Sequence, residues 1–166
     1  MSLPFSLAPC RRVVHTEPMR TRAEAAVTSS VTSAVTVEPI SAQDAAALIE
    51  SPSAGAVVTF SGDVRDHDHG RTVARLNYEG HPSAADVLAE VAREVASRHD
   101  VIGLAVMHRI GQLEIGDCAL AAAVSAAHRG AAFAACADLV DTTKERLPVW
   151  KHQVFSDGTD EWVNCA

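Results

Sequence analysis

Apolar side chains recur every third or fourth residue in three segments of the chain, which is the spacing typical of an amphipathic helix. We expect helices over residues 42–50, 83–99 and 129–147. The first follows a capping box in which Ser41 precedes Asp44, and Ser83 opens a similar pattern before the second. The third ends at Pro148, because proline cannot continue a helix.

Other segments are rich in β-branched residues or alternate between apolar and polar positions, as strands do. They cover residues 56–61, 73–79, 102–110, 118–126 and 149–155, and a short last strand is expected near Trp162. In the second of them, Ala74, Leu76 and Tyr78 are expected to share the buried face. Paired strands between helices favour an α+β fold, with a mixed, largely antiparallel sheet and three main helices.

The N-terminal part of the chain has a different character. Residues 1–36 lack hydrophobic periodicity and contain Pro4, Pro9 and Pro18, so we expect a flexible N-terminal extension before a domain at 37–166. Their acid-poor, Arg-bearing composition also fits an organelle transit peptide, which is the alternative interpretation of this segment. The four cysteines have no CxxC spacing, which favours reduced thiols and a cytoplasmic location.

Charge and composition limit the partners. The chain has 14 Lys and Arg residues against 21 Asp and Glu residues, a formal net charge of -7. This balance argues against a nucleic-acid partner, and no apolar run reaches the roughly 18 residues that a membrane span requires. An anionic ligand must therefore be held by a local cluster of cations. Lys144 and Lys151 are the only lysines, since every other basic residue is arginine.

Lys144 falls on one helical stripe with Phe133, Ala137 and Val140, so we expect its ammonium on the apolar face of the last helix. Burial there would lower the pKa of Lys144 and provide a neutral, nucleophilic or basic amine near neutral pH. A guanidinium cannot serve in this way. The structural alternative is a lysine that extends into solvent at a helix C-terminus.

Lys151 follows the break at Pro148. On the next strand it shares a face with Val149 and Gln153 and opposes Trp150. Two amines thus flank one proline bend. We predict that they face a shared, poorly hydrated hollow lined with arginine and histidine.

Three further residues are candidates for substrate binding. His128 and Arg129 lie where a strand passes into the last helix, and free N–H groups at a helix start attract anions. Arg65 follows a strand end, where a rigid scaffold often presents binding residues. Ordinary helix-start polarity and a surface arginine are the alternatives.

Two histidine-bearing segments are assigned no metal. Asp66, His67, Asp68 and His69 have ligand side chains, but neighbours in one solvated loop rarely converge on a metal ion without a further ligand from elsewhere. His108 lies in a strand expected to be buried and is interpreted as a hydrogen-bonded structural histidine.

Several blocks, taken in order, resemble the catalytic (large) subunit of molybdopterin synthase. They span residues 37–164 and read GAVVTFSGDVRDHDHG, LNYEGH, VMHRIGQLEIGD, SAAHRGAAFAA, DTTKERLPVWKHQ and DGTDEWV. The last two blocks place two lysines seven positions apart around Pro-x-Trp, which makes the ordered set specific.

The resemblance implies an α/β-hammerhead fold within the α+β class. It also implies a homodimer that binds a small ubiquitin-like sulfur-carrier subunit at each end, giving a heterotetramer. The carrier's Gly-Gly tail, charged as a thiocarboxylate, would enter a pocket. Sulfur would pass to cyclic pyranopterin monophosphate, or precursor Z, and form the dithiolene of molybdopterin with no cofactor or metal.

Residue roles follow from the same resemblance. Lys144 and Lys151 match the two active-site lysines, the first as acid/base or transient covalent partner and the second as the cation that neutralises or protonates the substrate. Arg65, His128 and Arg129 match anion-binding positions for the phosphate and pterin. A non-catalytic paralogue that binds pterin or carrier, and a Schiff-base enzyme that uses Lys144, are competing hypotheses.

Overall fold

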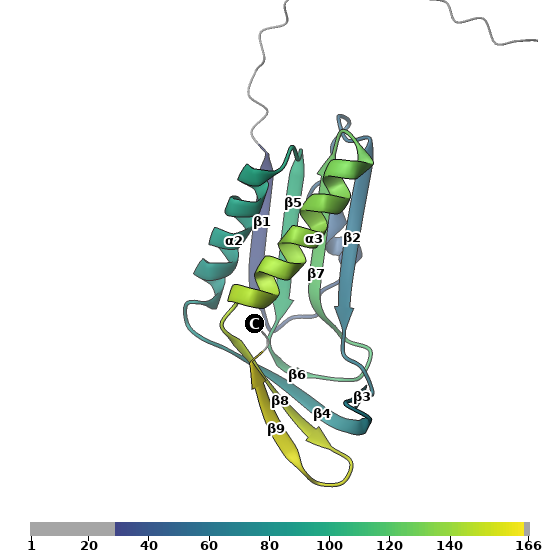
Figure 1. The fold of residues 1–166 in the computed structure, drawn as a ribbon, viewed down its shortest axis with the longest axis vertical. Coiled ribbons are helices and arrows are strands. Elements are labelled where there is room, and N and C mark those ends of the chain that lie inside the picture. Colours follow the sequence, from purple (N-terminus) through teal and green to yellow (C-terminus); the bar gives the residue numbers. More distant parts are fainter. Residues whose placement is uncertain (1–28, 165–166) are drawn as a thin grey trace, which may run out of the picture.

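The structure is a computed structural model and describes residues 29–164. Three helices and nine strands follow one another along this part of the chain (Figure 1). They are β1 (Ser30–Thr36), α1 (Ala42–Ala47), β2 (Ala56–Asp63), β3 (His67–Asp68), β4 (Arg71–Gly80), α2 (Ala84–Arg98), β5 (Gly103–Arg109), β6 (Gly111–Leu113), β7 (Cys118–Ala126), α3 (Arg129–Arg146), β8 (Val149–Phe155) and β9 (Asp160–Asn164).

The first sheet has four strands in the order β1-β5-β7-β2. β1 runs parallel to β5, while β7 pairs antiparallel with both β5 and β2. Helices α2 and α3 cover one face, where Leu104 and Val106 join the main core (Figure 1). The alternating neighbours Ala105 and Met107 face the other way and pack with α1. The sheet is therefore covered on both faces.

The second sheet lies beyond one end of the first and has the order β3-β4-β8-β9, with β6 paired to β4 (Figure 1). All of its pairings are antiparallel. The end of α3 leads through Pro148 directly into β8, so the helix C-terminus is joined to the second sheet by a sharp bend. This bend brings side chains from α3 and β8 near the gap between the two sheets.

The architecture confirms the predicted α+β class with three helices and mostly antiparallel strands. The helix start at Ser41 is also confirmed, because its Oγ accepts a hydrogen bond from the Asp44 backbone N–H at 3.0 Å. Ser83 makes no such cap, and its hydroxyl instead pairs with the His81 ring at 2.8 Å. The second predicted capping box is therefore wrong.

Two other predictions need correction. β1 occupies residues 30–36, which were assigned to the flexible extension, while residues 1–28 lie outside the described part. In β4 the register shifts between Val73 and Arg75, so Val73 is buried and Ala74 is exposed. The bulge reverses the expected orientation at the start of this strand and preserves it at Leu76. The short strands β3 and β6 were not predicted.

Candidate active site

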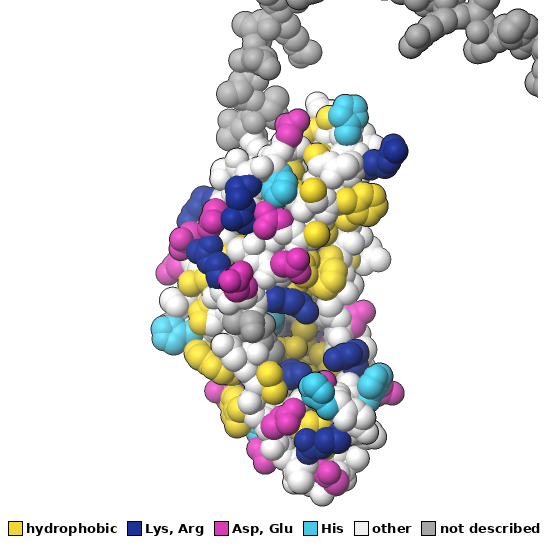
Figure 2. All heavy atoms as spheres, in the orientation of Figure 1, with side chains coloured by type: hydrophobic (Ala, Val, Ile, Leu, Met, Phe, Trp, Pro, Cys, Tyr) yellow, Lys and Arg dark blue, Asp and Glu magenta, His cyan; other side chains and the backbone are white. Residues whose placement is uncertain are grey.

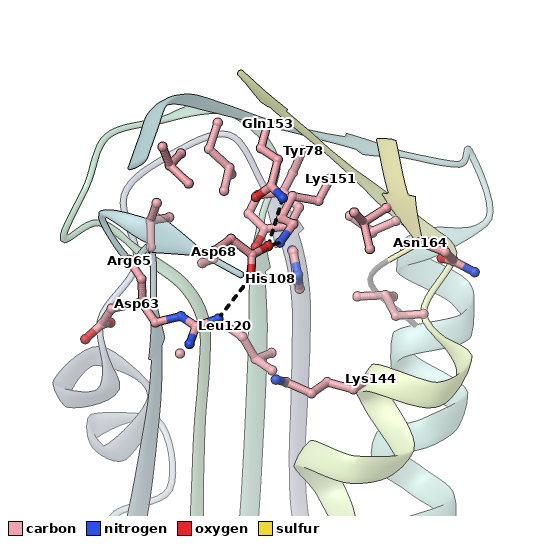
Figure 3. A pocket seen from close by; sticks show the side chains of 18 of the residues that line it. Asp63, Arg65, Asp68, Tyr78, His108, Leu120, Lys144, Lys151, Gln153 and Asn164 are labelled. Carbon is pink, nitrogen blue, oxygen red and sulfur yellow. Dashed lines mark hydrogen bonds and ion pairs between the residues drawn. The ribbon is translucent and has the colours of Figure 1, made fainter. Parts of the chain in front are cut away.

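A pocket of about 500 Å³ opens where the first sheet, the C-terminal end of α3 and the second sheet meet. In the space-filling view, Lys and Arg side chains surround apolar ones at a hollow in the lower half of the molecule (Figure 2). The charged and amide side chains of its lining include Asp63, Arg65, Asp68, Lys144, Lys151 and Gln153 (Figure 3). The pocket therefore combines three cations with two carboxylates.

Both predicted lysines line this pocket, although they come from α3 and β8. Lys151 shares its strand face with Val149 and Gln153 as predicted, and Trp150 points the other way and is 38% exposed. The side chain of Lys151 is only 17% exposed, because the second sheet and the loop after β2 enclose it. The shared hollow around the proline bend is thus present.

The expected burial of Lys144 is wrong for the single chain. Of the stripe it shares with Phe133, only Val140 is buried: Phe133 is 62% exposed, and Ala137 and Lys144 are exposed. The buried face of α3 is displaced from the predicted stripe by one residue around the helix. It consists of Ala132, Ala135, Cys136, Leu139, Val140 and Thr143. Within residues 29–164, the Lys144 ammonium makes no hydrogen bond or ion pair. It stands at the rim of the pocket and points into it (Figure 3).

Arg65 reaches the pocket from the segment after β2, which folds as a tight hairpin. His67 and Asp68 form β3, which pairs with the start of β4. The turn between these two strands has positive φ angles at His69 (47°) and Gly70 (77°). Glycine adopts this conformation without steric cost. The segment predicted as an open polar loop therefore holds Arg65 beside the lysines.

Asp68 is the carboxylate at the centre of the polar lining. Its Oδ2 accepts hydrogen bonds from Lys151 Nζ at 3.0 Å and from Gln153 Nε2 at 2.8 Å. Its Oδ1 lies 3.6 Å from the Arg65 guanidinium. The hydrogen bond from Gln153 first, and that from Lys151 second, lower the pKa of Asp68 to about 2. Asp68 is therefore ionised throughout the neutral range.

His108 forms part of the inner wall and is 6% exposed. Burial lowers the pKa of His108 to about 4, so the ring is neutral near pH 7. Its Nδ1 lies 2.9 Å from the Arg109 carbonyl, which assigns the ring proton to Nδ1 and leaves Nε2 as an acceptor. The ring meets Tyr78 edge-on at 5.2 Å between centroids. This matches the predicted hydrogen-bonded histidine, although it also lines the pocket.

His128 and Arg129 lie elsewhere in the chain. Both are exposed at the start of α3, where they line a separate, more open hollow of about 480 Å³. Fifteen residues of helix at 1.5 Å each put about 22 Å between Arg129 and Lys144 along the axis. Within a single chain, His128 and Arg129 therefore do not line the pocket of Lys144 and Lys151.

Comparison with known proteins gives the family. The family model described as "MoaE protein" matches residues 35–146. The chain belongs to the MoaE family. It is 39% identical over 127 residues to the molybdopterin synthase catalytic subunit of Pyrococcus abyssi, covering 76% of this chain and 85% of the relative. The Aspergillus niger protein of the same name is 38% identical over 129 residues, which cover 77% of this chain and 72% of that protein.

A solved structure of molybdopterin synthase from Staphylococcus aureus has the same fold, with a TM-score of 0.71 and 33% sequence identity. The match covers 78% of this chain and 94% of that chain. The resemblance inferred from the ordered blocks is thus confirmed at the level of the MoaE family. Of the five candidate residues, Lys151 alone lies beyond the segment matched by the family model.

Two features are absent from the described residues of this MoaE chain. No helix in residues 29–164 is long and apolar enough to cross a membrane. In the same range, no group of three or more His, Cys, Asp and Glu side chains is arranged to hold a metal ion.

Sequence reasoning missed Asp68 and Gln153 as members of the site. Asp68 was considered only as a metal ligand, and Gln153 only as a neighbour on the face of Lys151. Gln153 is 1% exposed, and its amide nitrogen donates to both Asp68 and Glu161. The available signal was the face shared by Lys151 and Gln153, because two polar residues on the inner face of a strand require buried partners.

Proposed function

We propose that this chain is the catalytic subunit of a molybdopterin synthase, a sulfurtransferase of molybdenum cofactor biosynthesis. In this proposal the pocket transfers sulfur from the thiocarboxylated Gly-Gly tail of a small ubiquitin-like carrier to precursor Z. The observation that carries the proposal is the convergence of Arg65, Lys144 and Lys151 on one pocket. A thiocarboxylate and a cyclic phosphate are both anions, and clustered cations offset the cost of removing them from water.

Lys144 is the residue proposed to act on the carrier tail. Its ammonium is exposed and lacks a partner within residues 29–164, so it is free to approach an incoming group. A docked tail would cover the pocket rim and exclude water around Lys144. There the amine is proposed to act as acid/base or as transient covalent partner at the carbonyl carbon that bears the sulfur.

Lys151 and Arg65 are proposed to bind the phosphorylated pterin. Lys151 is held within the pocket, and its ammonium stabilises charge that develops as the cyclic phosphate opens. The Arg65 guanidinium is 68% exposed and presents a fork of N–H donors that suits a phosphate. These roles need no metal or other cofactor.

His128 and Arg129 require a second copy of the chain in this proposal. They sit at the opposite end of α3 from Lys144, so one chain does not place them at its own pocket. In a homodimer with antiparallel α3 helices, the start of one helix approaches the end of the other. Each site would then combine three cations of one chain with His128 and Arg129 of its partner, within a heterotetramer that includes two carriers.

The deciding experiment is reconstitution. The purified chain, a thiocarboxylated carrier and precursor Z should yield molybdopterin, whereas a carrier ending in an ordinary carboxylate should not. Lys144→Ala should lower the rate by about 100-fold or more, as loss of an acid/base group does. Arg93→Ala is the matched control, because Arg93 is an exposed cation on α2 outside the pocket. Unchanged turnover by Lys144→Ala would refute the assignment.

The non-catalytic alternative makes a different forecast. A paralogue that only binds would retain the carrier and the pterin together and release no product. Binding measurements made alongside the reconstitution therefore separate the two hypotheses. A Schiff-base enzyme would instead be trapped by borohydride at Lys144 with a carbonyl substrate.

The proposed location is the cytoplasm. Cys118 and Cys136 are free thiols, as proteins of a reducing compartment carry. Fractionation of native cells, with the chain followed by antibody, tests this location.

A further inference from the structure

The two pocket lysines are held in different ways. Lys151 donates to Asp68 at 3.0 Å, and the two side chains are 17% and 14% exposed. Lys144 is exposed and has no such partner within residues 29–164. A nearly buried ion pair restrains its lysine far more than an exposed position does, because water competes little for the ammonium.

Asp68 is itself fixed from two directions. The hairpin turn at His69 and Gly70 directs it into the pocket, where β3 pairs with β4. Gln153, 1% exposed, donates one amide N–H to Asp68 and the other to Glu161. An amide nitrogen has two donors, so both are used and the side chain cannot rotate without losing a bond.

We propose that Asp68 is a positioning residue that holds Lys151 at a fixed point in the pocket and leaves Lys144 as the mobile amine. Asp68 uses one of the three N–H groups of the Lys151 ammonium, so the others stay available for an anion. The division of labour in sulfur transfer rests on the proposed function. The restraint on Lys151 does not, and it can be measured in the chain alone.

Competitive amine labelling tests the restraint. The folded chain is reacted with a small reagent that methylates or acetylates amines, and the rates at Lys144 and Lys151 are followed by mass spectrometry. Lys151 should react more slowly than Lys144. In Asp68→Ala the rate at Lys151 should rise by about tenfold, the factor expected for loss of a charge-assisted hydrogen bond, and the rate at Lys144 should not change.

Two further variants make this test specific. Asp68→Asn keeps an acceptor oxygen and removes the charge, so the rate at Lys151 should rise by a smaller factor. Asp66→Asn is the matched control, because Asp66 lies in the same hairpin, 71% exposed, and its side chain pairs with His67 and does not line the pocket. It should change neither rate. An unchanged rate at Lys151 in Asp68→Ala, or an equal rise at both lysines, would overturn the proposal.

The same variants, assayed in the reconstituted synthase, test the consequence for the reaction. Asp68→Ala should lower kcat/KM by about tenfold, and Asp68→Asn should recover part of the loss. An absence of product even with the unchanged chain would refute the proposed function and leave the labelling result standing. A wild-type kcat/KM in Asp68→Ala would show that the restraint has no catalytic role and overturn that part of the inference.

Discussion

Arg129 and Lys144 lie at opposite ends of the same helix. Arg129 is the first residue of α3, and Lys144 is two residues before its end. The family resemblance assigns Lys144 to catalysis and Arg129 to binding of the phosphate and pterin in one site, yet a rigid helix keeps them about 22 Å apart. The proposed function therefore requires that a complete site is built from two copies of the chain.

Complementation between two inactive variants tests this requirement. Lys144→Ala and Arg129→Ala chains, given different tags and co-expressed, form mixed dimers that can be purified by both tags. One site of each mixed dimer then has both residues intact, and the other site lacks both. We expect about half of the wild-type rate per dimer, although each variant alone is nearly inactive.

The control pairs Lys144→Ala with Lys151→Ala. These residues lie on the same chain and line the same pocket, so every site in that mixed dimer lacks one lysine. It should show no recovery. Recovery in this pair, or none in the first, would mean that the sites are not shared between chains as proposed.

The elements that could be predicted from sequence are those whose signal is local. In the three helices, apolar side chains recur every three or four residues, and β5 and β7 are apolar runs joined by turn glycines. Each of these patterns can be recognised within a short stretch of sequence. β1 was missed because its pattern, SVTSAVT, mixes polar and apolar residues at half-buried positions. Its partner β5 lies more than 70 residues away, and nothing local indicates that pairing.

The candidate site shows the same limit. Lys144 and Lys151 could be found because their type and spacing are visible in the sequence. The face of α3 could not be fixed as safely, since a rotation of one residue, about 100°, exchanges a buried side chain for an exposed one. The role of Asp68 depends on the hairpin of β3 and β4 and on its contact with Lys151 of β8, which is 83 residues away along the chain. This role is therefore visible only in the folded chain.

The N-cap of α1 gives a prediction about stability. Ser41→Ala removes the hydroxyl that accepts from the Asp44 N–H, so the free energy of unfolding should fall by about 1 kcal/mol. Ser83→Ala is the matched control, since Ser83 precedes α2 and makes no side-chain cap bond. Urea unfolding followed by circular dichroism measures both. Equal losses in the two variants would contradict the assigned cap.

Substitution by alanine should change the stability of the protein in opposite directions at two glycines. A Cβ at Gly103 would lie 2.9 Å from both Ile49 Cβ and Ser125 Oγ, so Gly103→Ala should cost about 1–3 kcal/mol by overpacking. At Gly130, in the first turn of α3, a Cβ meets nothing within 4 Å. Gly130→Ala should therefore stabilise the protein by about 0.5–1 kcal/mol, because alanine favours the helix. Thermal unfolding checks both, and a loss in Gly130→Ala would contradict the open space described here.

The burial of His108 leads to a prediction of how the stability of the protein depends on pH. Burial lowers the pKa of His108 from 6.5 to about 4, so between these values the unfolded chain binds a proton that the folded chain does not. The free energy of unfolding should therefore fall as the pH drops from about 6.5 to about 4, by roughly 3 kcal/mol. The lowered pKa of Asp68 acts in a separate window, below its ordinary value of 3.8 and down to about 2.

Urea unfolding at a series of pH values separates the His108 contribution from the rest. His108→Gln keeps a polar side chain that does not titrate, so the slope of stability against pH between 4 and 6.5 should flatten. The slope is the readout, because the substitution itself changes absolute stability. His128→Gln, which removes an exposed histidine, should keep the wild-type slope. A steep slope that persists in His108→Gln would show that another group binds the proton on unfolding.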